Sequence, residues 1–354
     1  MAGIEKALFG FLPNGGEVYA YTLRNRKGMS VKILNYGGVI VELLVPDRHG
    51  RLADVVGGYD DLSSYLEGDG YQGALIGRVC NRIAKGRFFL EGKEYCLFQN
   101  DGANHLHGGR IGFSGKLWKG TEMDGEEPEL KLSLTSPHGD EGYSGSLEVT
   151  VSYRLTEQNG LVLRYVARTD RTTVINLTNH SYFNLRGVDS ESVLTQTLWL
   201  DADTYLPTDE ELIPTGELRR VEGTPFDFRC SKEIGRDIDV ENEDLKRAGG
   251  YDHCLCFRGP VVREPRRRGE LYDQESGRVM TLFTNQPCVQ LYTGNFLGNP
   301  RFPFKGGISQ RPRALLCLET QRMPDSVHHS DFTDCTLRPG EIYDYTTEYR
   351  FSVR

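Results

Sequence analysis

Apolar and polar residues alternate along most of this chain with a period of two, the pattern of half-buried β-strands. The alternation is clearest over residues 146–170, where the turn Gln158-Asn-Gly160 predicts a hairpin. Tyr345, Tyr349 and Phe351 alternate in a closing strand. Further strands are predicted at 18–23, 30–34, 39–45, 86–90, 250–257, 279–284, 288–293 and 314–321, and one short helix at 60–66. The pattern predicts an all-β protein, a large antiparallel sandwich or barrel with few short helices.

Length and composition narrow the class of protein. The chain has 354 residues and no internal repeat, linker or low-complexity segment, so we expect a single domain over 1–354. Its 42 Lys plus Arg against 50 Asp plus Glu give a net charge of −8, which argues against a nucleic-acid or anionic-membrane partner. No apolar stretch approaches the roughly 20 residues of a membrane helix. The basic run 263–268 lies among Pro and Gly and is predicted to be a solvated loop.

The eight cysteines have no spacing typical of a disulfide framework, and several lie inside apolar runs. Buried, reduced thiols in a cytoplasmic protein are therefore expected. Cys254 and Cys256 are separated by one residue rather than two, and their strand context favours the core over redox chemistry.

One stretch, residues 174–185, combines apolar and polar positions in an unusual way. Interpreted as a strand, it places Ile175, Leu177, Phe183 and Leu185 on one face and Asn176, Thr178, His180, Tyr182 and Asn184 on the other. Such a polar row holds neutral donors and acceptors and one group that titrates near neutral pH. It would suit a neutral polyhydroxyl ligand and the transfer of a proton. The alternative is an edge strand whose polar face meets water.

Three other features could carry chemistry. Glu319 follows the apolar run Leu315-Leu-Cys-Leu318, where a buried carboxylate must either pair with an Arg or serve as a base. His105 and His107 could bind a metal with His180 or Glu319, although no cupin-like Glu follows them. Asp252 lies at a Gly turn, as a turn residue or a ligand.

The chain has no Gly-rich phosphate loop and no Gly-x-Ser-x-Gly nucleophile elbow. We therefore expect neither a cofactor nor a covalent nucleophile. Chemistry that uses one His and one Glu is most simply proton transfer.

Taken together, the polar motifs resemble those of the aldose 1-epimerase (galactose mutarotase) family, occur in the family's order and span nearly the whole chain. The matching stretches are Asn35-Tyr-Gly-Gly38, Gly77-Arg-Val-Cys-Asn-Arg-Ile83, Asn104-His-Leu-His-Gly-Gly109, Asn176-Leu-Thr-Asn-His-Ser-Tyr-Phe-Asn-Leu185, Tyr251-Asp-His253, Gln290-Leu-Tyr-Thr-Gly-Asn-Phe296 and Leu318-Glu-Thr-Gln321.

The resemblance implies a β-supersandwich with an open sugar cleft and interconversion of the α and β anomers of aldoses such as galactose and glucose. It implies His180 as general acid and Glu319 as general base, with sugar hydroxyls held by Asn81, Arg82, His107, Tyr182, Asp252 and Gln290. Asp252 is also a candidate for keeping His180 protonated. No cofactor or metal is implied, the partner is a small aldose, and a monomer or weak homodimer is expected.

The sequence departs from the family pattern at two places and leaves alternatives open. Cys254 stands where the family often shows Asn, and residues 258–269 look like an Arg-rich insertion. A hexose-6-phosphate 1-epimerase would share the fold but needs extra cationic side chains at the cleft. A glycoside hydrolase would need two carboxylates, conceivably Glu319 and Asp252. A sugar-binding module without catalysis would not need both His180 and Glu319.

Overall fold

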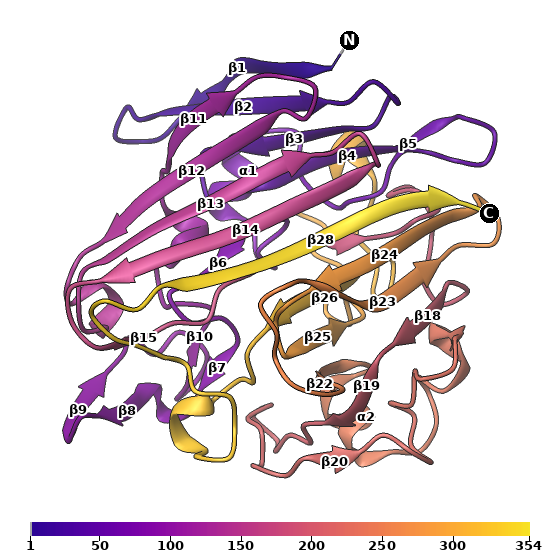
Figure 1. The fold of residues 1–354 in the computed structure, drawn as a ribbon. Helices are drawn as coiled ribbons and strands as arrows, with labels where there is room; N and C mark the ends of the chain where they lie inside the picture. Colours follow the sequence, from indigo (N-terminus) through magenta and orange to yellow (C-terminus); the bar gives the residue numbers. More distant parts are fainter. Residues whose placement is uncertain (1) are drawn as a thin grey trace.

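Strands dominate the computed structural model, which describes residues 2–354. The largest sheet has nine strands, and its centre is formed by β28, which follows every other element in the sequence (Figure 1). In order across the sheet the strands are β11 (Lys119–Met123), β12 (Glu129–Ser136), β13 (Leu147–Leu155), β14 (Gly160–Thr169), β28 (Tyr343–Val353), β24 (Arg278–Thr284), β23 (Arg266–Tyr272), β18 (Thr197–Leu200) and β21 (Lys232–Glu233). Neighbouring strands are antiparallel.

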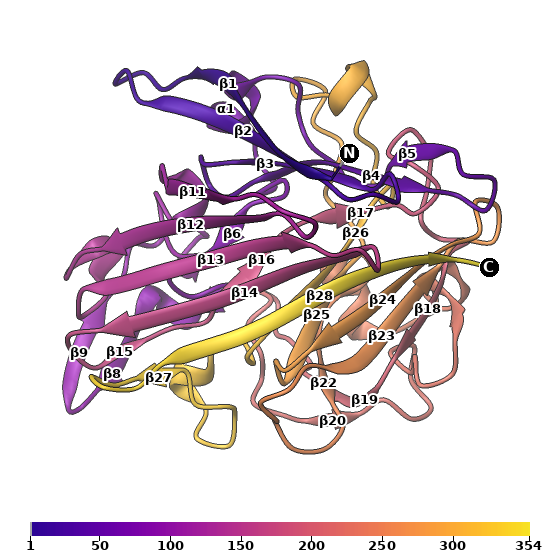
Figure 2. The same cartoon turned by 45° about the horizontal axis from the view of Figure 1, so that its top comes forward.

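A six-stranded sheet lies behind the nine-stranded one (Figure 2). Its strands, in order, are β17 (Tyr182–Phe183), β26 (Leu316–Gln321), β25 (Cys288–Tyr292), β22 (Asp252–Phe257), β19 (Ala202–Tyr205) and β20 (Arg219–Arg220). The two sheets share one apolar core, in which Leu291 and Leu318 lie in the same buried cluster as Leu163 and Tyr349. The Tyr349 hydroxyl also donates to the Leu318 carbonyl at 2.9 Å. Antiparallel sheets packed face to face are held by such alternating inward residues.

The amino-terminal part of the chain forms a five-stranded sheet whose strands lie side by side in sequence order. This sheet lies at the top of Figure 2, at the end of the molecule away from β19 and β20. It comprises β1 (Gly3–Phe11), β2 (Glu17–Arg24), β3 (Ser30–Leu34), β4 (Ile40–Pro46) and β5 (Leu52–Asp54). Two-stranded ribbons join β6 (Leu75–Ile76) to β16 (Thr178–Asn179), β7 (Arg82–Ile83) to β10 (His105–Leu106), β8 (Arg87–Leu90) to β9 (Lys93–Cys96) and β15 (Thr173–Val174) to β27 (Thr336–Leu337).

Two short α-helices are capped as their sequences dictate. Helix α1 (Leu62–Glu67) begins after Asp61, whose carboxylate accepts from the Ser64 backbone N–H at 2.9 Å. Helix α2 (Glu243–Ala248) begins after Asn242 and ends at Gly249, which has a left-handed backbone with φ 69°. No helix in the described part of the chain is long and apolar enough to cross a membrane.

The structure confirms the all-β, antiparallel prediction and most of the predicted strands. The hairpin expected over 146–170 is β13 and β14, which pair from Leu147–Thr169 to Leu155–Leu161. The helix expected at 60–66 is α1, shifted by two residues at its start because Asp61 caps it rather than Asp60.

The prediction of one continuous strand over 174–185 is wrong. The segment is broken into β15, β16 and β17, each of two residues and each paired with a different partner strand. Both sets of side chains are buried, so the predicted polar face is not a single surface. Asn176 and Asn184 instead satisfy backbone groups of neighbouring segments, at the Arg322 N–H and carbonyl and at the Ala314 carbonyl. These polar side chains alternate like one face of a strand, but they bind backbone groups that sheet pairing would otherwise satisfy where the chain crosses between sheets.

The prediction that 263–268 is a solvated loop is also wrong at its end. Residues from Arg266 onward belong to β23, and Arg268 is buried. Its guanidinium donates to the Asp201 carboxylate and to the Arg258 carbonyl, both at 2.8 Å. A buried arginine is tolerated where it is paired in this way.

Candidate active site

Three polar side chains lie on one face of the six-stranded sheet. Glu319 of β26 is directly opposite Gln290 of β25, and Gln290 is opposite Cys254 of β22, two residues from Asp252 on the same face. The Gln290 amide donates to Asp252 Oδ1 at 2.7 Å. Gln290 Oε1 and Glu319 Oε2 are buried without a hydrogen-bond partner among the described residues. These acceptors are therefore free to bind a ligand that brings its own donors.

His180 lies between β16 and β17, where the chain approaches β26. Its backbone N–H donates to the Ala74 carbonyl at 2.8 Å, and its carbonyl accepts from Gly73 at 3.0 Å. Its Nε2 is 3.7 Å from Glu319 Oε1, and its Nδ1 is 3.5 Å from the Cys317 Sγ. Each ring nitrogen therefore has its own neighbour, and the nitrogen that faces the carboxylate is Nε2.

Aromatic rings surround the His180 imidazole. Their centroid distances from it are 5.0 Å for Tyr182, 5.3 Å for His107, 6.0 Å for Tyr71 and 6.3 Å for Tyr292. Tyr182 is paired with Cys317 across β17 and β26, which fixes its ring beside the imidazole. Flat apolar faces with polar edges of this kind pack against the carbon faces of a sugar ring.

The ribbon of β7 and β10 brings Asn81, Arg82 and His107 to the same place. Asn81 and His107 both have left-handed backbones, with φ 58° and 52°, and the Asn81 N–H donates to His107 Nδ1 at 3.2 Å. Arg82 Nε donates to Asp101 Oδ2 at 2.8 Å, which fixes the direction of its guanidinium. Strained backbone in a polar cluster often accompanies function.

Burial sets the proton affinities of the site. It lowers the pKa of His180 to about 4 and raises the pKa of Glu319 well above its ordinary value, the latter with a contribution from the charge of Asp252. Burial also raises the pKa of Asp252, although the Arg82 charge opposes that shift. The pKa of His107 is lowered, first by burial and then by the His180 and Arg82 charges. Burial therefore favours a neutral His180 beside a protonated Glu319 in the empty site, so that the pair holds one proton.

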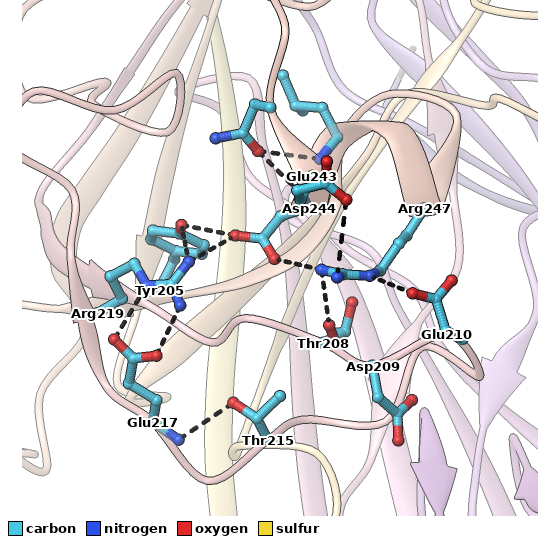
Figure 3. A network of polar contacts seen from close by, with 12 residues as sticks. Tyr205, Thr208, Asp209, Glu210, Thr215, Glu217, Arg219, Glu243, Asp244 and Arg247 are labelled. Carbon is cyan, nitrogen blue, oxygen red and sulfur yellow. Dashed lines mark hydrogen bonds and ion pairs between the residues drawn. The ribbon is translucent and has the colours of Figure 1, made fainter.

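A network of charges beside the site fixes the segment that enters β22 (Figure 3). Asp244 of α2 is buried, and its carboxylate accepts from Tyr205 at 2.8 Å, from Arg219 at 3.0 Å and from Arg247 at 3.2 Å. Arg219 and Arg247 also bind Glu217 and Glu210 in the loop that follows Tyr205. The next residue of that loop, Glu211, accepts from Asn104 at 3.4 Å. The network thus connects α2, which shortly precedes Asp252, to the loop that reaches the Asn104–His107 segment.

Comparison with known proteins identifies the family. The family described as aldose 1-epimerase matches residues 19–350. The chain is 43% identical to a galactose mutarotase from Bos taurus over the full length of both chains, and 35% identical to an aldose 1-epimerase from Escherichia coli, with 96% of each covered. The chain belongs to the aldose 1-epimerase family.

Solved structures of similar proteins agree with this assignment. A galactose 1-epimerase from Lactobacillus acidophilus superposes with a TM-score of 0.87 at 28% identity, covering 100% of this chain and 99% of that one. An aldose epimerase homologue from C. elegans gives a TM-score of 0.83 at 28% identity, covering 93% and 97%. The galactose mutarotase-like supersandwich predicted from the sequence is confirmed, and this member of the aldose 1-epimerase family is an isomerase that acts on carbohydrates.

The structure brings the predicted site residues of this aldose 1-epimerase together. His180 contacts Glu319, and the rings of His107 and Tyr182 lie beside the His180 imidazole. The Asn81 backbone N–H donates to His107, and Asp252 accepts from Gln290. The charge of Arg82 acts to lower the pKa of Asp252, which burial raises. Their roles toward a sugar stay predictions.

Two expectations about partners need revision. The carboxylate next to His180 is Glu319, whereas Asp252 accepts a hydrogen bond from Gln290. His105 does not join the site, because its Nδ1 faces the Phe98 carbonyl at 2.7 Å and its Nε2 faces the Tyr143 hydroxyl at 2.6 Å. The two histidines of the His-Leu-His motif therefore do not converge on one metal. Among the proposed site residues and their contacts, His180, Cys317 and Glu319 offer ligand atoms within 4.8 Å of one another.

Sequence reasoning missed Tyr71, Cys317 and Asp101. Tyr71 contacts the His107 ring edge-on at 4.7 Å, Cys317 contacts His180, and Asp101 binds Arg82. Asp101 and Tyr71 lie in Gly-rich loops, where polar and aromatic residues are too common to be distinctive. Cys317 was assigned to the core, and its burial is consistent with that, but its alternation with Glu319 was the available signal.

Proposed function

We propose that this protein interconverts the α and β anomers of free aldohexoses such as galactose and glucose, with His180 as general acid and Glu319 as general base. The observation that carries the proposal is the 3.7 Å contact between His180 Nε2 and Glu319 Oε1, two side chains that are both buried. An imidazole and a carboxylate are the pair that ring opening requires. We further propose that Asn81, Arg82, His107, Tyr182, Asp252 and Gln290 hold the hydroxyl groups of the sugar.

The proposed reaction moves two protons and breaks one bond. Glu319 removes the proton of the C1 hydroxyl while His180 delivers a proton to the ring oxygen O5, so the C1–O5 bond opens to the aldehyde. Rotation about C1–C2 presents the other face of the aldehyde, and closure reverses both transfers. The general acid of opening then acts as the general base of closing. Because no electron or group is transferred, this chemistry uses only the residues of the chain.

The pair must carry one proton for this exchange. In the empty site burial favours the arrangement of neutral His180 and protonated Glu319. A bound sugar supplies the C1 hydroxyl as a donor to the Glu319 carboxylate and O5 as an acceptor for His180. These hydrogen bonds favour the ionised arrangement, with the proton on His180, that the opening step uses.

The cleft supports a free sugar better than a sugar phosphate. The one guanidinium among the proposed ligands, Arg82, is already bound by Asp101, and the ligand Asp252 and the proposed base Glu319 both carry carboxyl groups. A phosphate dianion would meet two carboxyl groups and one neutralised cation. Neutral hydroxyls, by contrast, match the amide, imidazole and carboxyl groups present.

We also propose that the protein acts in the cytoplasm as a monomer or weak homodimer. All eight proposed site residues come from one chain, so catalysis does not require a second copy. All eight cysteines lie among the described residues, and none forms a disulfide, as expected in a reducing compartment. Size-exclusion chromatography with light scattering would measure the oligomeric state, and a stable dimer or larger assembly would contradict this proposal.

The test follows the optical rotation of freshly dissolved α-D-galactose and α-D-glucose with EDTA present. The protein should accelerate relaxation to the final rotation that each sugar reaches spontaneously. His180→Asn and Glu319→Gln should each lose about 10²–10⁴-fold in kcat/KM, because each removes one positioned proton transfer.

Gln274→Asn provides a control, since Gln274 is an exposed residue outside the cleft. Wild-type protein that leaves both spontaneous rates unchanged would refute the free-hexose assignment. Acceleration seen only with hexose 6-phosphates would replace it with the phosphate-specific activity. Full activity in both active-site variants would refute the proposed pair while leaving the epimerase activity intact.

A further inference from the structure

Three cysteine thiols meet on the sheet face that carries the proposed active site. Cys254 and Cys256 are two residues apart on β22 and therefore project from the same face. Cys288 of β25 is directly opposite Cys256. All three are buried, and their sulfur atoms lie within 4.8 Å of one another.

Apolar side chains and one thioether pack against this thiol cluster. Leu206, Phe332 and the partly buried thioether residue Met323 pack against it. Among residues 2–354, no His, Asp or Glu ligand atom belongs to the same group. The donor set consists of three sulfurs, which is unlike the mixed set of His180, Cys317 and Glu319 at the cleft.

A cavity gives access to the cluster from outside. It has a volume of about 180 Å³, and its lining includes Cys256, Met323 and Arg268. The Nε of Arg268 is buried without a hydrogen-bond partner, although the same guanidinium donates to Asp201 through another nitrogen. The lining of the cavity thus holds a thioether and a cationic group together with the Cys256 thiol.

We propose that Cys254, Cys256 and Cys288 form a binding site for one Cu(I) ion. Soft thiolate ligands select Cu(I). Structural zinc sites almost always have four ligands, and the described residues supply only three sulfurs here. Binding involves no change of oxidation state: one Cu(I) bonds to the three sulfurs, and each thiol that becomes a thiolate ligand releases its proton to solvent. The site goes beyond the proposed epimerase activity and does not depend on it.

The position of the cluster connects it to the sugar cleft. Cys254 is directly opposite Gln290, the residue that holds Asp252. A metal at the cluster would thus lie one cross-strand pair from Gln290, and Asp252 is two residues from Cys254 on β22. The distance between opposed side chains in such pairs is about 5 Å.

The experiment titrates the reduced, full-length protein with Cu(I) under anaerobic conditions, in competition with the chromophoric chelator bicinchoninate. We expect the wild-type chain to remove one equivalent of Cu(I) from the chelator, and the copper-edge X-ray absorption spectrum to show sulfur-only coordination. Cys256→Ala and Cys288→Ala should each weaken Cu(I) binding by about 100-fold or more, because two sulfurs remain. Parallel titrations use Zn(II) and Cd(II), which should bind more weakly than Cu(I).

Cys335→Ala is the matched control, because Cys335 is a buried thiol in a different apolar cluster. Cys254→Ser nearly preserves side-chain volume and tests the site if the alanine variants do not fold, as judged by circular dichroism. Copper bound equally by wild type and the Cys256 and Cys288 variants would overturn the proposal. Failure of the wild-type chain to compete with bicinchoninate, nitrogen or oxygen in the copper shell, or tighter binding of Zn(II) would also overturn it.

Discussion

His180 and Glu319 are both buried, so neither side chain ionises readily. Their burial therefore determines the pH range over which the proposed catalytic pair holds one proton. Burial lowers the pKa of His180 to about 4, so the pair gains a second proton only in acid. Burial raises the pKa of Glu319, so the pair loses its single proton only above the ordinary range of a carboxyl group. The one-proton state that the proposed mechanism needs therefore spans the interval between these two titrations.

We accordingly expect a bell-shaped dependence of kcat/KM on pH. Activity should fall on the acid side near pH 4, where His180 is protonated beside a neutral Glu319, and on the alkaline side as the raised pKa of Glu319 is passed. Polarimetry across the pH range, with the spontaneous rate subtracted, measures the profile. An acid limb near pH 6.5, the ordinary pKa of histidine, would contradict the effect of burial.

Glu319→Gln should raise the stability of the protein at neutral pH. The folded chain keeps a proton on Glu319 that the unfolded chain releases above about pH 4.5, so the wild-type free energy of unfolding decreases as the pH rises from 4.5 toward the raised pKa. Glutamine has no such proton. The variant should melt about 2 °C or more above wild type at pH 7, and the difference should vanish below pH 4.5.

A thermal melt of Glu191→Gln supplies the comparison, because Glu191 is exposed and should behave like wild type at both pH values. A Glu319→Gln variant that is less stable at pH 7 would show that the carboxylate is ionised in the folded state.

Cys317 contacts His180 Nδ1 and leaves Nε2 toward Glu319, which makes it a positioning residue. A Cys317 sulfur that accepts from Nδ1–H favours the tautomer with an unprotonated Nε2, the nitrogen that would take the Glu319 proton and deliver it to O5. Cys317→Ala should therefore lower kcat by about 10-fold with little change in KM and alter the acid limb of the pH profile, whereas Cys80→Ala, at another buried thiol, should not. Kinetics of both variants measure this, and an unchanged pH profile in Cys317→Ala would contradict it.

The chemical identity of these residues could be predicted, but their partners could not. Glu319 was distinctive because it follows an apolar run, and His180 because it is the one group in a polar row that titrates near neutral pH. Tyr71 and Cys317 were missed because they contact residues that are distant in sequence. The residues next to them in the sequence do not indicate these contacts. The hydrogen bond between Asp252 and Gln290 could not be predicted for the same reason, since it depends on the pairing of β22 with β25.

At the scale of elements, the charge network around α2 holds the strand that carries Asp252. Asp244 is buried and bound by Tyr205, Arg219 and Arg247 (Figure 3). We expect Asp244→Ala to reduce the free energy of unfolding by about 3 kcal/mol, because it leaves two guanidinium groups without their shared partner. The KM for galactose should also rise, since the entry into β22 loses its anchor.

Urea unfolding and mutarotase kinetics test both effects. Glu191→Ala removes an ion pair with Arg311 in which both side chains are exposed, and it should change the free energy of unfolding by less than about 0.5 kcal/mol. An Asp244→Ala variant of wild-type stability would show that the network is not structural.

Elements with long, regular alternation were predictable, whereas the segment 174–185 was not. β13 and β14 follow a period of two over nine and ten residues and were located within a residue or two. The segment with β15, β16 and β17 also alternates, but it changes partners every few residues and replaces sheet pairing by side-chain hydrogen bonds. The alternation of polar and apolar residues does not show which strand a segment pairs with, because that pairing is set only in the folded chain.

On the scale of the whole molecule, one buried cluster runs from Tyr21 to Phe351 and includes residues of all three large sheets. We therefore expect a single cooperative thermal transition, in keeping with the predicted single domain. Differential scanning calorimetry measures it, and equal calorimetric and van't Hoff enthalpies are the criterion. Two resolved transitions would indicate two independently folding units.

β28 lies between β14 and β24 although it follows both in sequence. During synthesis, the two halves of the nine-stranded sheet therefore wait with open backbone edges until the strand that joins them has left the ribosome. Such edges recruit other chains in the crowded cell. A nascent molecule of this protein should depend on chaperones until β28 emerges. Chains truncated before residue 343 should aggregate rather than fold into enzymes of low activity.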